Sequence, residues 1–158
     1  MTLKRQLALS AYATAVLSLI APAAQAAPTH FHGAMVIVAK AGTCADYDPT
    51  GEELQVRFRP ANVGANGPDT GFTFLWSNGG YGATVPGPIT AAYKTATITS
   101  LFDFGFTGGT EQVRFTSQAP PTITVTTPSV NVTGNLTDFD GMPGCTVTFR
   151  MTAVQRIN

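Results

Sequence analysis

The stretch that decides the fold is Gly144-Cys145-Thr146-Val147-Thr148-Phe149-Arg150-Met151-Thr152-Ala153-Val154, near the end of the 158-residue sequence. Every second position from Cys145 to Ala153 is apolar, and the positions between them carry three threonines and Arg150. Successive side chains of a strand point to opposite faces, so a strict period of two is typical of a strand buried on one side. The stretch therefore predicts a β-strand with one face in a hydrophobic core.

Residues 1–26 have the three parts of a secretory signal peptide. Lys4 and Arg5 are basic, residues 7–20 are mostly apolar, and Ala24-Gln25-Ala26 matches an A-x-A cleavage site. The apolar run is short for a bilayer span, and no later run is long enough for a membrane helix. We expect cleavage after Ala26 and a periplasmic or extracellular location; the alternative is an interfacial helix that stays attached. Residues 27–158 then form a single domain.

Two cysteines give the chain one candidate covalent constraint. Cys44 closes the first long apolar run after the signal segment, and Cys145 begins the decisive stretch. Cysteines of an exported chain most simply form a disulfide, and no C-x-x-C spacing points to a redox thiol. We expect a Cys44–Cys145 disulfide that joins the first strand to the last.

The charge of the released chain limits its partners. Without Lys4 and Arg5, seven basic residues face nine acidic ones, a net charge of −2. This balance argues against nucleic acid or an anionic membrane surface as the partner, and leaves a surface protein or a glycan. The content of Phe, Val and Ile is too high for a disordered chain.

Further short segments carry strand patterns. Residues 34–39 are apolar on both faces, residues 53–59 alternate, and Phe72, Phe74 and Trp76 share one face. The other predicted strands lie within residues 95–99, 102–106, 112–116, 122–127 and 130–132. Gly- and Pro-rich segments, among them residues 77–88, and the pair Gly134-Asn135 are predicted as loops or turns. The fold class we predict is all-β, an antiparallel β-sandwich or partly closed barrel of seven to nine short strands with one disulfide.

Acidic residues flank both cysteines. Asp46 and Asp48 follow Cys44, and Asp138 and Asp140 precede Cys145, so a disulfide would bring the two acidic turns to one end of the domain. Carboxylates on flexible loops are the ligands that Ca²⁺ prefers, and a calcium site is one hypothesis for this end. The order Asp46-x-Asp48-x-x-Gly51 resembles the opening of an EF-hand loop, but Arg57 stands at its twelfth position, which excludes that motif. The other interpretation is an ordinary pair of turns.

Two aromatic residues border the Gly-rich segment 77–88. Trp76 and Tyr81 could present a ring face and a polar edge to a ligand, which is the basis for a small carbohydrate-binding module as one functional hypothesis. Packing in the core is the other interpretation of both rings.

No catalytic constellation is visible. Both histidines, His30 and His32, lie at the start of the released chain; they share one face of an extended segment and could reach one Zn²⁺ or Cu²⁺, but no third ligand is apparent. A hydrolase would have to use the carboxylates of the acidic end. The sequence favours an exported, non-enzymatic module with a binding or structural role in the periplasm or at the cell surface, with the carbohydrate-binding module and the hydrolase as alternatives.

Overall fold

The computed structural model describes residues 27–44, 48–75, 79–89, 94–97, 99–103 and 111–156. Within these ranges the chain is nearly all β, with one short 3₁₀ turn, η1, at Phe139–Gly141. The strands are β1 (His30–Gly42), β2 (Glu53–Arg59), β3 (Asp69–Leu75), β4 (Gly79–Pro86), β5 (Lys94–Thr97), β6 (Thr99–Asp103), β7 (Gln112–Ala119), β8 (Ser129–Thr137) and β9 (Cys145–Arg156). None of the described residues forms a helix long and apolar enough to span a bilayer.

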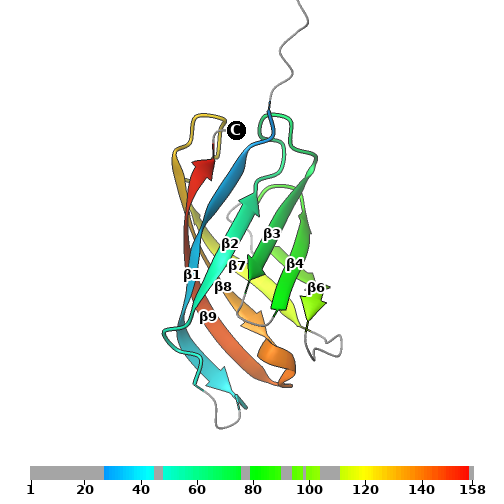
Figure 1. The fold of residues 1–158 in the computed structure, drawn as a ribbon, viewed down its shortest axis with the longest axis vertical. Helices are drawn as coiled ribbons and strands as arrows, with labels where there is room; N and C mark the ends of the chain where they lie inside the picture. Colours follow the sequence, from blue (N-terminus) through cyan, green and yellow to red (C-terminus); the bar gives the residue numbers. More distant parts are fainter. Residues whose placement is uncertain are drawn as a thin grey trace, which may run out of the picture.

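All these strands belong to one antiparallel sheet, whose order is β5-β7-β8-β9-β1-β2-β3-β4-β6. The seven longer strands, β1–β4 and β7–β9, make a curled half-barrel, and β5 and β6 extend its two edges (Figure 1). One residue separates β5 from β6 in the sequence, so the two edges of the sheet must approach each other there. The all-β prediction is confirmed, and of its two forms the partly closed barrel is the one that the chain adopts.

The alternation of the decisive stretch reports burial as expected. In β9, Val147, Phe149, Met151 and Ala153 are buried, whereas Arg150 and Thr152 between them are exposed. β9 lies in the middle of the sheet between β1 and β8, with Phe149 opposite Ile37 on one side and Gly134 on the other. Its inner face therefore contributes to the centre of the core.

Aromatic rings fill the centre of the barrel. The ring of Phe72 packs edge-on against Phe115, with centroids 5.1 Å apart, and stacks on Phe149 at 5.9 Å. Phe31 and Phe58 form a second contact, at 6.2 Å, among buried side chains of β1 and β2. Rings from at least four strands thus occupy the interior, which is a packed core and not a lumen.

Three local predictions are wrong, each because of a glycine or a threonine. The predicted loop 77–88 contains the strand β4, in which a side chain on Gly79 would meet the Tyr81 ring at 3.0–3.2 Å. The predicted turn Gly134-Asn135 lies inside β8, where the absence of a side chain at Gly134 makes room for the Phe149 ring. Glycine in these strands makes space for rings and does not mark a turn.

The third wrong prediction is the strand at residues 122–127. This segment lies in the β7–β8 connection, and its threonines bond one another and the local backbone: the Thr124 N–H donates to Thr127 Oγ1 at 2.9 Å. Threonine side chains that bond nearby backbone compete with a strand ladder, so a Thr-rich alternating pattern also suits a turn.

The ends of the barrel differ in what they carry. His30 of β1 pairs with Arg156 of β9 at one end, called here the terminal end. Gly42 pairs with Cys145 at the other, called here the disulfide end, which also carries η1 (Figure 1). Candidate sites occur at both ends.

Candidate functional site

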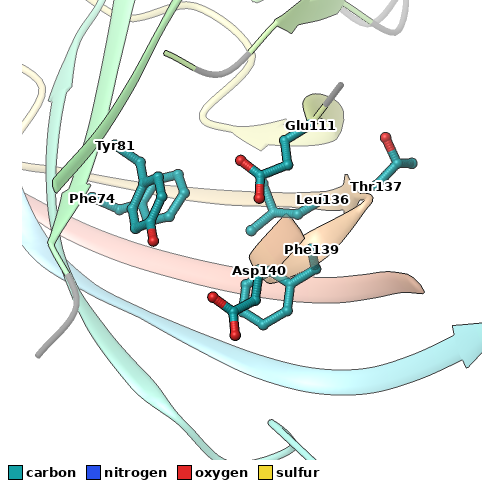
Figure 2. A pocket seen from close by; sticks show the side chains of 7 residues that line it. All are labelled: Phe74, Tyr81, Glu111, Leu136, Thr137, Phe139 and Asp140. Carbon is teal, nitrogen blue, oxygen red and sulfur yellow. The ribbon is translucent and has the colours of Figure 1, made fainter. Parts of the chain in front are cut away.

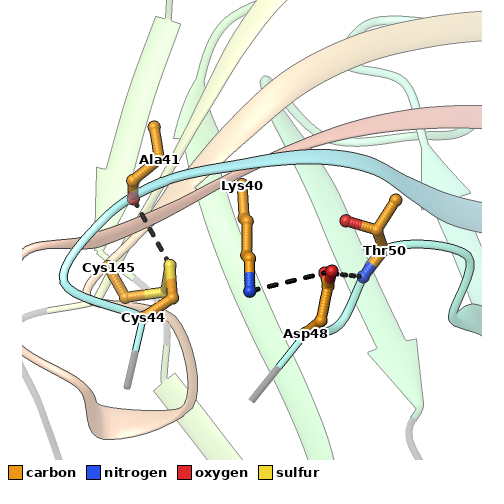
Figure 3. Close-up of polar contacts among 6 residues, drawn as sticks. All are labelled: Lys40, Ala41, Cys44, Asp48, Thr50 and Cys145. Carbon is orange, nitrogen blue, oxygen red and sulfur yellow. Dashed lines mark hydrogen bonds and ion pairs between the residues drawn. A yellow bond between two sulfur atoms is a disulfide. The ribbon is translucent and has the colours of Figure 1, made fainter. Parts of the chain in front are cut away.

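The predicted disulfide is present at the disulfide end. Cys44 and Cys145 are bonded, with Cα atoms 4.4 Å apart, although 101 positions separate them in the sequence (Figure 3). Next to the bond, Thr43 donates its N–H to the Gly144 carbonyl at 3.2 Å and its hydroxyl to the Pro143 carbonyl at 2.6 Å. These contacts bring the β1–β2 loop and the β8–β9 turn together, as the sequence predicted.

Asp48, one of the predicted calcium ligands, has protein partners. Its Oδ1 accepts the Thr50 N–H at 3.0 Å, and its Oδ2 lies 3.7 Å from Lys40 Nζ (Figure 3). Hydrogen bonds from Thr50 lower the pKa of Asp48, and Lys40 adds a smaller favourable charge. The carboxylate thus stabilises its own loop. Asp46 lies outside the described residues.

The two aspartates of the β8–β9 turn do different work. Asp138 Oδ1 accepts the Gly144 N–H at 2.8 Å and so holds the turn, whereas Asp140 is exposed. Both adopt left-handed backbone angles, φ 53° and 55°, which Asp tolerates better than most residues. Within the described ranges, no three His, Cys, Asp or Glu side chains are arranged to hold a metal ion. The calcium site stays a prediction, and at least two of its four proposed carboxylates serve the turns.

Two glutamates that the sequence did not single out are partly or fully buried at this end. Glu111 is 3% exposed, and its Oε1 accepts the Gly141 N–H at 2.8 Å. Glu52 lies at the entry to β2, where its backbone bonds that of Ile37; burial, with a further contribution from the Asp140 charge, raises its pKa. Each glutamate stands just outside a strand, where periodicity says nothing about burial.

A small, partly open cavity lies beside Glu111 at the disulfide end. Its volume is about 10 Å³, and Figure 2 shows the Glu111 carboxylate, the Tyr81 ring and the Phe139 ring around it. Its other lining residues are Phe74, Leu136, Thr137 and Asp140. The space suits one water molecule and is far smaller than a ligand pocket, so it offers no room for a sugar ring.

Tyr81, proposed as a ligand-binding residue, is part of the core. It is 6% exposed, and its ring stacks on Phe74 with centroids 5.0 Å apart and planes 18° from parallel (Figure 2). This packing leaves Tyr81 no ring face to offer to a ligand. Trp76, its proposed partner, lies outside the described residues.

A larger cavity, of about 250 Å³, opens at the terminal end between the β2–β3 and β7–β8 connections. Its described lining is mostly apolar or amide, with no ionisable side chain: Pro60, Ala61, Asn62, Val63, Pro88, Ile89, Gln118, Pro121, Thr122 and Ile123. Such a lining can shelter an apolar group, and the described residues of the cavity supply no ionisable side chain to act as acid or base.

The outer face of the terminal end carries a group of basic side chains, called here the basic patch. Its members are His30, His32, Arg57, Arg59 and Arg156. The sequence indicated its parts separately, since Arg57 and Arg59 alternate outward and the histidines share a face; the pairing of β1 with β2 and β9 joins them. Arg57 Nη2 lies 3.2 Å from His30 Nε2 and donates to it, so it occupies the lone pair that Zn²⁺ or Cu²⁺ would need. The surrounding arginines would also repel a cation, which argues against the two-histidine metal site.

Comparisons with models of protein families, with curated proteins and with solved structures find no match to this chain, so no relative supplies a function for it.

Proposed function

We propose that the chain is an exported, non-enzymatic binding module that engages its partner through the outer surface of the barrel, in the periplasm or at the cell surface. The observation that carries the proposal is the filled interior. Phe72, Phe115 and Phe149 are almost fully buried at the centre of the barrel, where a carrier protein would keep its ligand. A barrel without a lumen has its outer face and its loops left for recognition.

The polar groups of the described chain support the same proposal. Both histidines lie on the outer face at the terminal end, far along the barrel from the carboxylates Glu52, Glu111 and Asp140. A histidine and a carboxylate that act as general acid and base must reach one substrate together, and these histidines and carboxylates lie at opposite ends of the molecule. The disulfide adds support for export, because such bonds persist in oxidising compartments.

The experiment that tests the proposal follows the full chain in a bacterial expression host. Cells that express a C-terminally tagged chain are fractionated, and the protein is purified from each fraction for intact-mass measurement. We expect residues 27–158 in the periplasm or medium, with the first residue Ala27, and sedimentation together with isolated cell envelopes. Protein that is found in the cytoplasm with Met1 still present would contradict the proposal. Exported protein that does not sediment with cell envelopes would also contradict it.

A further inference from the structure

The basic patch concentrates charge on a protein whose released chain is acidic overall. Residues 27–158 have seven arginines and lysines, and three of them, with both histidines, gather here. His32 lies directly opposite Arg57 across the β1–β2 ladder, and His30 lies opposite Arg156 across the β1–β9 ladder. Adjacent strands lie ~4.8 Å apart and alternate residues of a strand ~6.8 Å apart, so these side chains share one small area.

The arginines of the patch are exposed and have no acidic partner among the described residues. Arg57 and Arg59 alternate with buried neighbours such as Phe58, which fixes them on the outer face, and Arg156 is exposed at the end of β9. In the described part of the chain no carboxylate lies within 4.0 Å of any of the three. Positive charges held side by side without counter-charges repel one another, and a bound anion would relieve this repulsion.

Gly71 extends the patch across a fourth strand. It lies opposite Arg59 in the β2–β3 ladder, and a side-chain carbon placed on it would meet Arg59 Nε at 3.4 Å and Nη2 at 3.6 Å. The guanidinium of Arg59 therefore lies over β3, in the space that a larger residue would fill. The patch therefore extends from Arg156 on β9, across the two histidines of β1 and the two arginines of β2, to the space over Gly71 on β3.

The surroundings of His30 make its protonation sensitive to a bound anion. Because Arg57 donates to its Nε2, the neutral ring carries its proton on Nδ1, which is buried and has no hydrogen-bond partner among the described residues. Burial and then the charges of Arg57, His32 and Arg59 lower the pKa of His30, and burial, Arg57 and Arg156 lower that of His32. An anion placed among these groups would offset the charge contributions and favour the protonated rings.

We infer that the basic patch binds an acidic polysaccharide, whose repeated sulfate or carboxylate groups contact Arg156 on β9 and Arg57 and Arg59 on β2. The inference rests on the proposed function and names the chemical class of its partner. Guanidinium groups match the planar geometry of carboxylates and also bind sulfate by paired N–H donors. Neither of the two cavities described above is lined by a patch residue, and the three arginines are exposed. A single small ion would therefore meet one or two arginines in open solvent, whereas a polymer reaches all three.

The other polyanions fit the patch less well. Tight DNA binding commonly uses six to ten phosphate contacts, roughly twice what three arginines supply, and the released chain is net negative. Recruitment to an anionic membrane usually needs about four to eight clustered lysines or arginines. The outer face beside the patch instead carries uncharged polar groups, Gln55 and Thr73, which can bond sugar hydroxyls.

The test measures binding of the full released chain, with its disulfide intact, to immobilised dextran sulfate, to alginate and to neutral dextran. We expect binding to at least one of the charged polymers that weakens with salt and none to dextran. Arg57→Gln/Arg59→Gln should reduce affinity at least tenfold, and binding should strengthen from pH 7.5 to pH 5.5. Duplex DNA and vesicles of phosphatidylglycerol are measured in parallel.

The matched control is Arg114→Gln/Arg150→Gln, which removes the same charge from exposed positions of β7 and β9 outside the patch. We expect it to change affinity less than twofold, and all variants should keep the near-ultraviolet circular dichroism of the folded chain. If both double variants lose affinity equally, binding depends only on the net charge of the protein, and the inference is wrong. Tighter binding of DNA or of vesicles than of either charged polymer would also overturn it.

Failure of this inference and failure of the proposed function give different results. If the exported protein sediments with envelopes but does not bind dextran sulfate or alginate, the inference of an acidic polysaccharide partner is wrong. The proposal of an exported binding module is then still supported. Protein that stays in the cytoplasm and ignores envelopes refutes both.

Discussion

Phe149 shows how single residues combine to make the core. Its side chain is fully buried, and its ring stacks on Phe72 and meets Phe115 edge-on. Gly134 on the neighbouring strand leaves the ring its space, because a side-chain carbon there would lie 2.5 Å from a ring carbon. We expect Phe149→Ala to lower the free energy of unfolding by ~3–5 kcal/mol, since it leaves a cavity among three strands.

Thr148 provides the control for this substitution on the same strand. It lies on the outer face, where its hydroxyl donates to Asn135 Oδ1 at 3.1 Å. Thr148→Ala should cost less than ~1 kcal/mol, because it removes one partly exposed hydrogen bond. Urea unfolding of both variants measures the difference, and equal losses would mean that alternation in β9 does not report burial.

The histidines of the basic patch should titrate below their ordinary value of 6.5, because burial and the neighbouring arginines favour the neutral rings. The unfolded chain then binds more protons than the folded one as pH falls through 6.5. Stability is therefore complete above this pH and decreases below it. NMR titration of the two ring signals measures the pKa values directly.

Removing the neighbouring charges separates the two causes of that depression. In Arg57→Gln/Arg59→Gln the pKa of His30 should rise but stay below 6.5, since burial remains the largest cause. A His30 pKa at or above 6.5 in the unmodified protein would contradict the arrangement of the patch.

At the scale of elements, the disulfide links the ends of β1 and β9, two strands that already pair along most of their length. It restricts the unfolded chain by closing a loop of 101 positions, and the chain-entropy model gives about 4.7 kcal/mol for a loop of this size. We expect Cys44→Ser/Cys145→Ser to lose ~2–5 kcal/mol in urea unfolding while keeping the strand content. Free-thiol titration of the native protein should read near zero.

Two results would contradict this account of the disulfide. Two reactive thiols in the native protein, or a disulfide-linked dimer on a non-reducing gel, would show that the pairing is wrong. Unchanged stability of the double variant would mean that the unfolded chain is already restricted at this loop.

The elements that the sequence predicts well are those whose burial is one-sided. Residues 53–59 and the decisive stretch alternate without interruption, and both are strands with that burial pattern. β4 was not predicted, because Gly79, Gly80 and Gly82 give no alternation of apolar and polar side chains. Each of these glycines nevertheless pairs with a neighbouring strand. The need for glycine there comes from a ring, Tyr81, that only the folded chain brings into contact.

The candidate site was predictable only to the level of its parts. Two cysteines in a chain that carries the pattern of a signal peptide predicted the disulfide, and period two predicted that Arg57 and Arg59 face outward. What the sequence cannot supply is register, because the meeting of His32 with Arg57 and of His30 with Arg156 depends on pairings between strands distant in the chain.

The whole molecule has opposite charge character at its two ends. The terminal end carries the basic patch and one carboxylate, Asp69 of β3, and the disulfide end carries one lysine, Lys40, and the carboxylates Asp48, Asp138, Asp140, Glu52 and Glu111. Such a molecule meets an acidic polymer preferentially through one end, because the field of the other end repels it. The proposed partner therefore also implies an orientation of the barrel on it.

Calcium remains a prediction for the acidic end. A bound Ca²⁺ would stabilise the folded chain by mass action, so the melting temperature should rise with millimolar CaCl₂ and fall with chelator at constant ionic strength. Asp140→Asn should abolish the response, whereas Asp69→Asn, at the start of β3, should keep it. No change with calcium or chelator would assign these carboxylates to the turns alone.

The pKa of Glu52 shows that several carboxylates at one end of the barrel lower its stability. Burial first, and then the charge of Asp140, raise its pKa above the ordinary 4.5. The folded chain therefore holds this proton more tightly than the unfolded chain. The stability contribution is complete below pH 4.5 and is lost as pH rises through the raised value. Glu52→Gln should accordingly raise the melting temperature at pH 7, and the gain should vanish near pH 4.

The control is Glu53→Gln, which removes the same charge from the exposed neighbour of Glu52. If the two variants gain equally at pH 7, the cause is the net charge of the molecule and not the burial of one carboxylate. If only Glu52→Gln raises the melting temperature, the destabilisation comes from the Glu52 carboxylate, which lies where the β1–β2 loop meets the β8–β9 turn. That place exists because the disulfide and the Thr43 hydrogen bonds hold the two connections together, so the same gain should shrink in Cys44→Ser/Cys145→Ser.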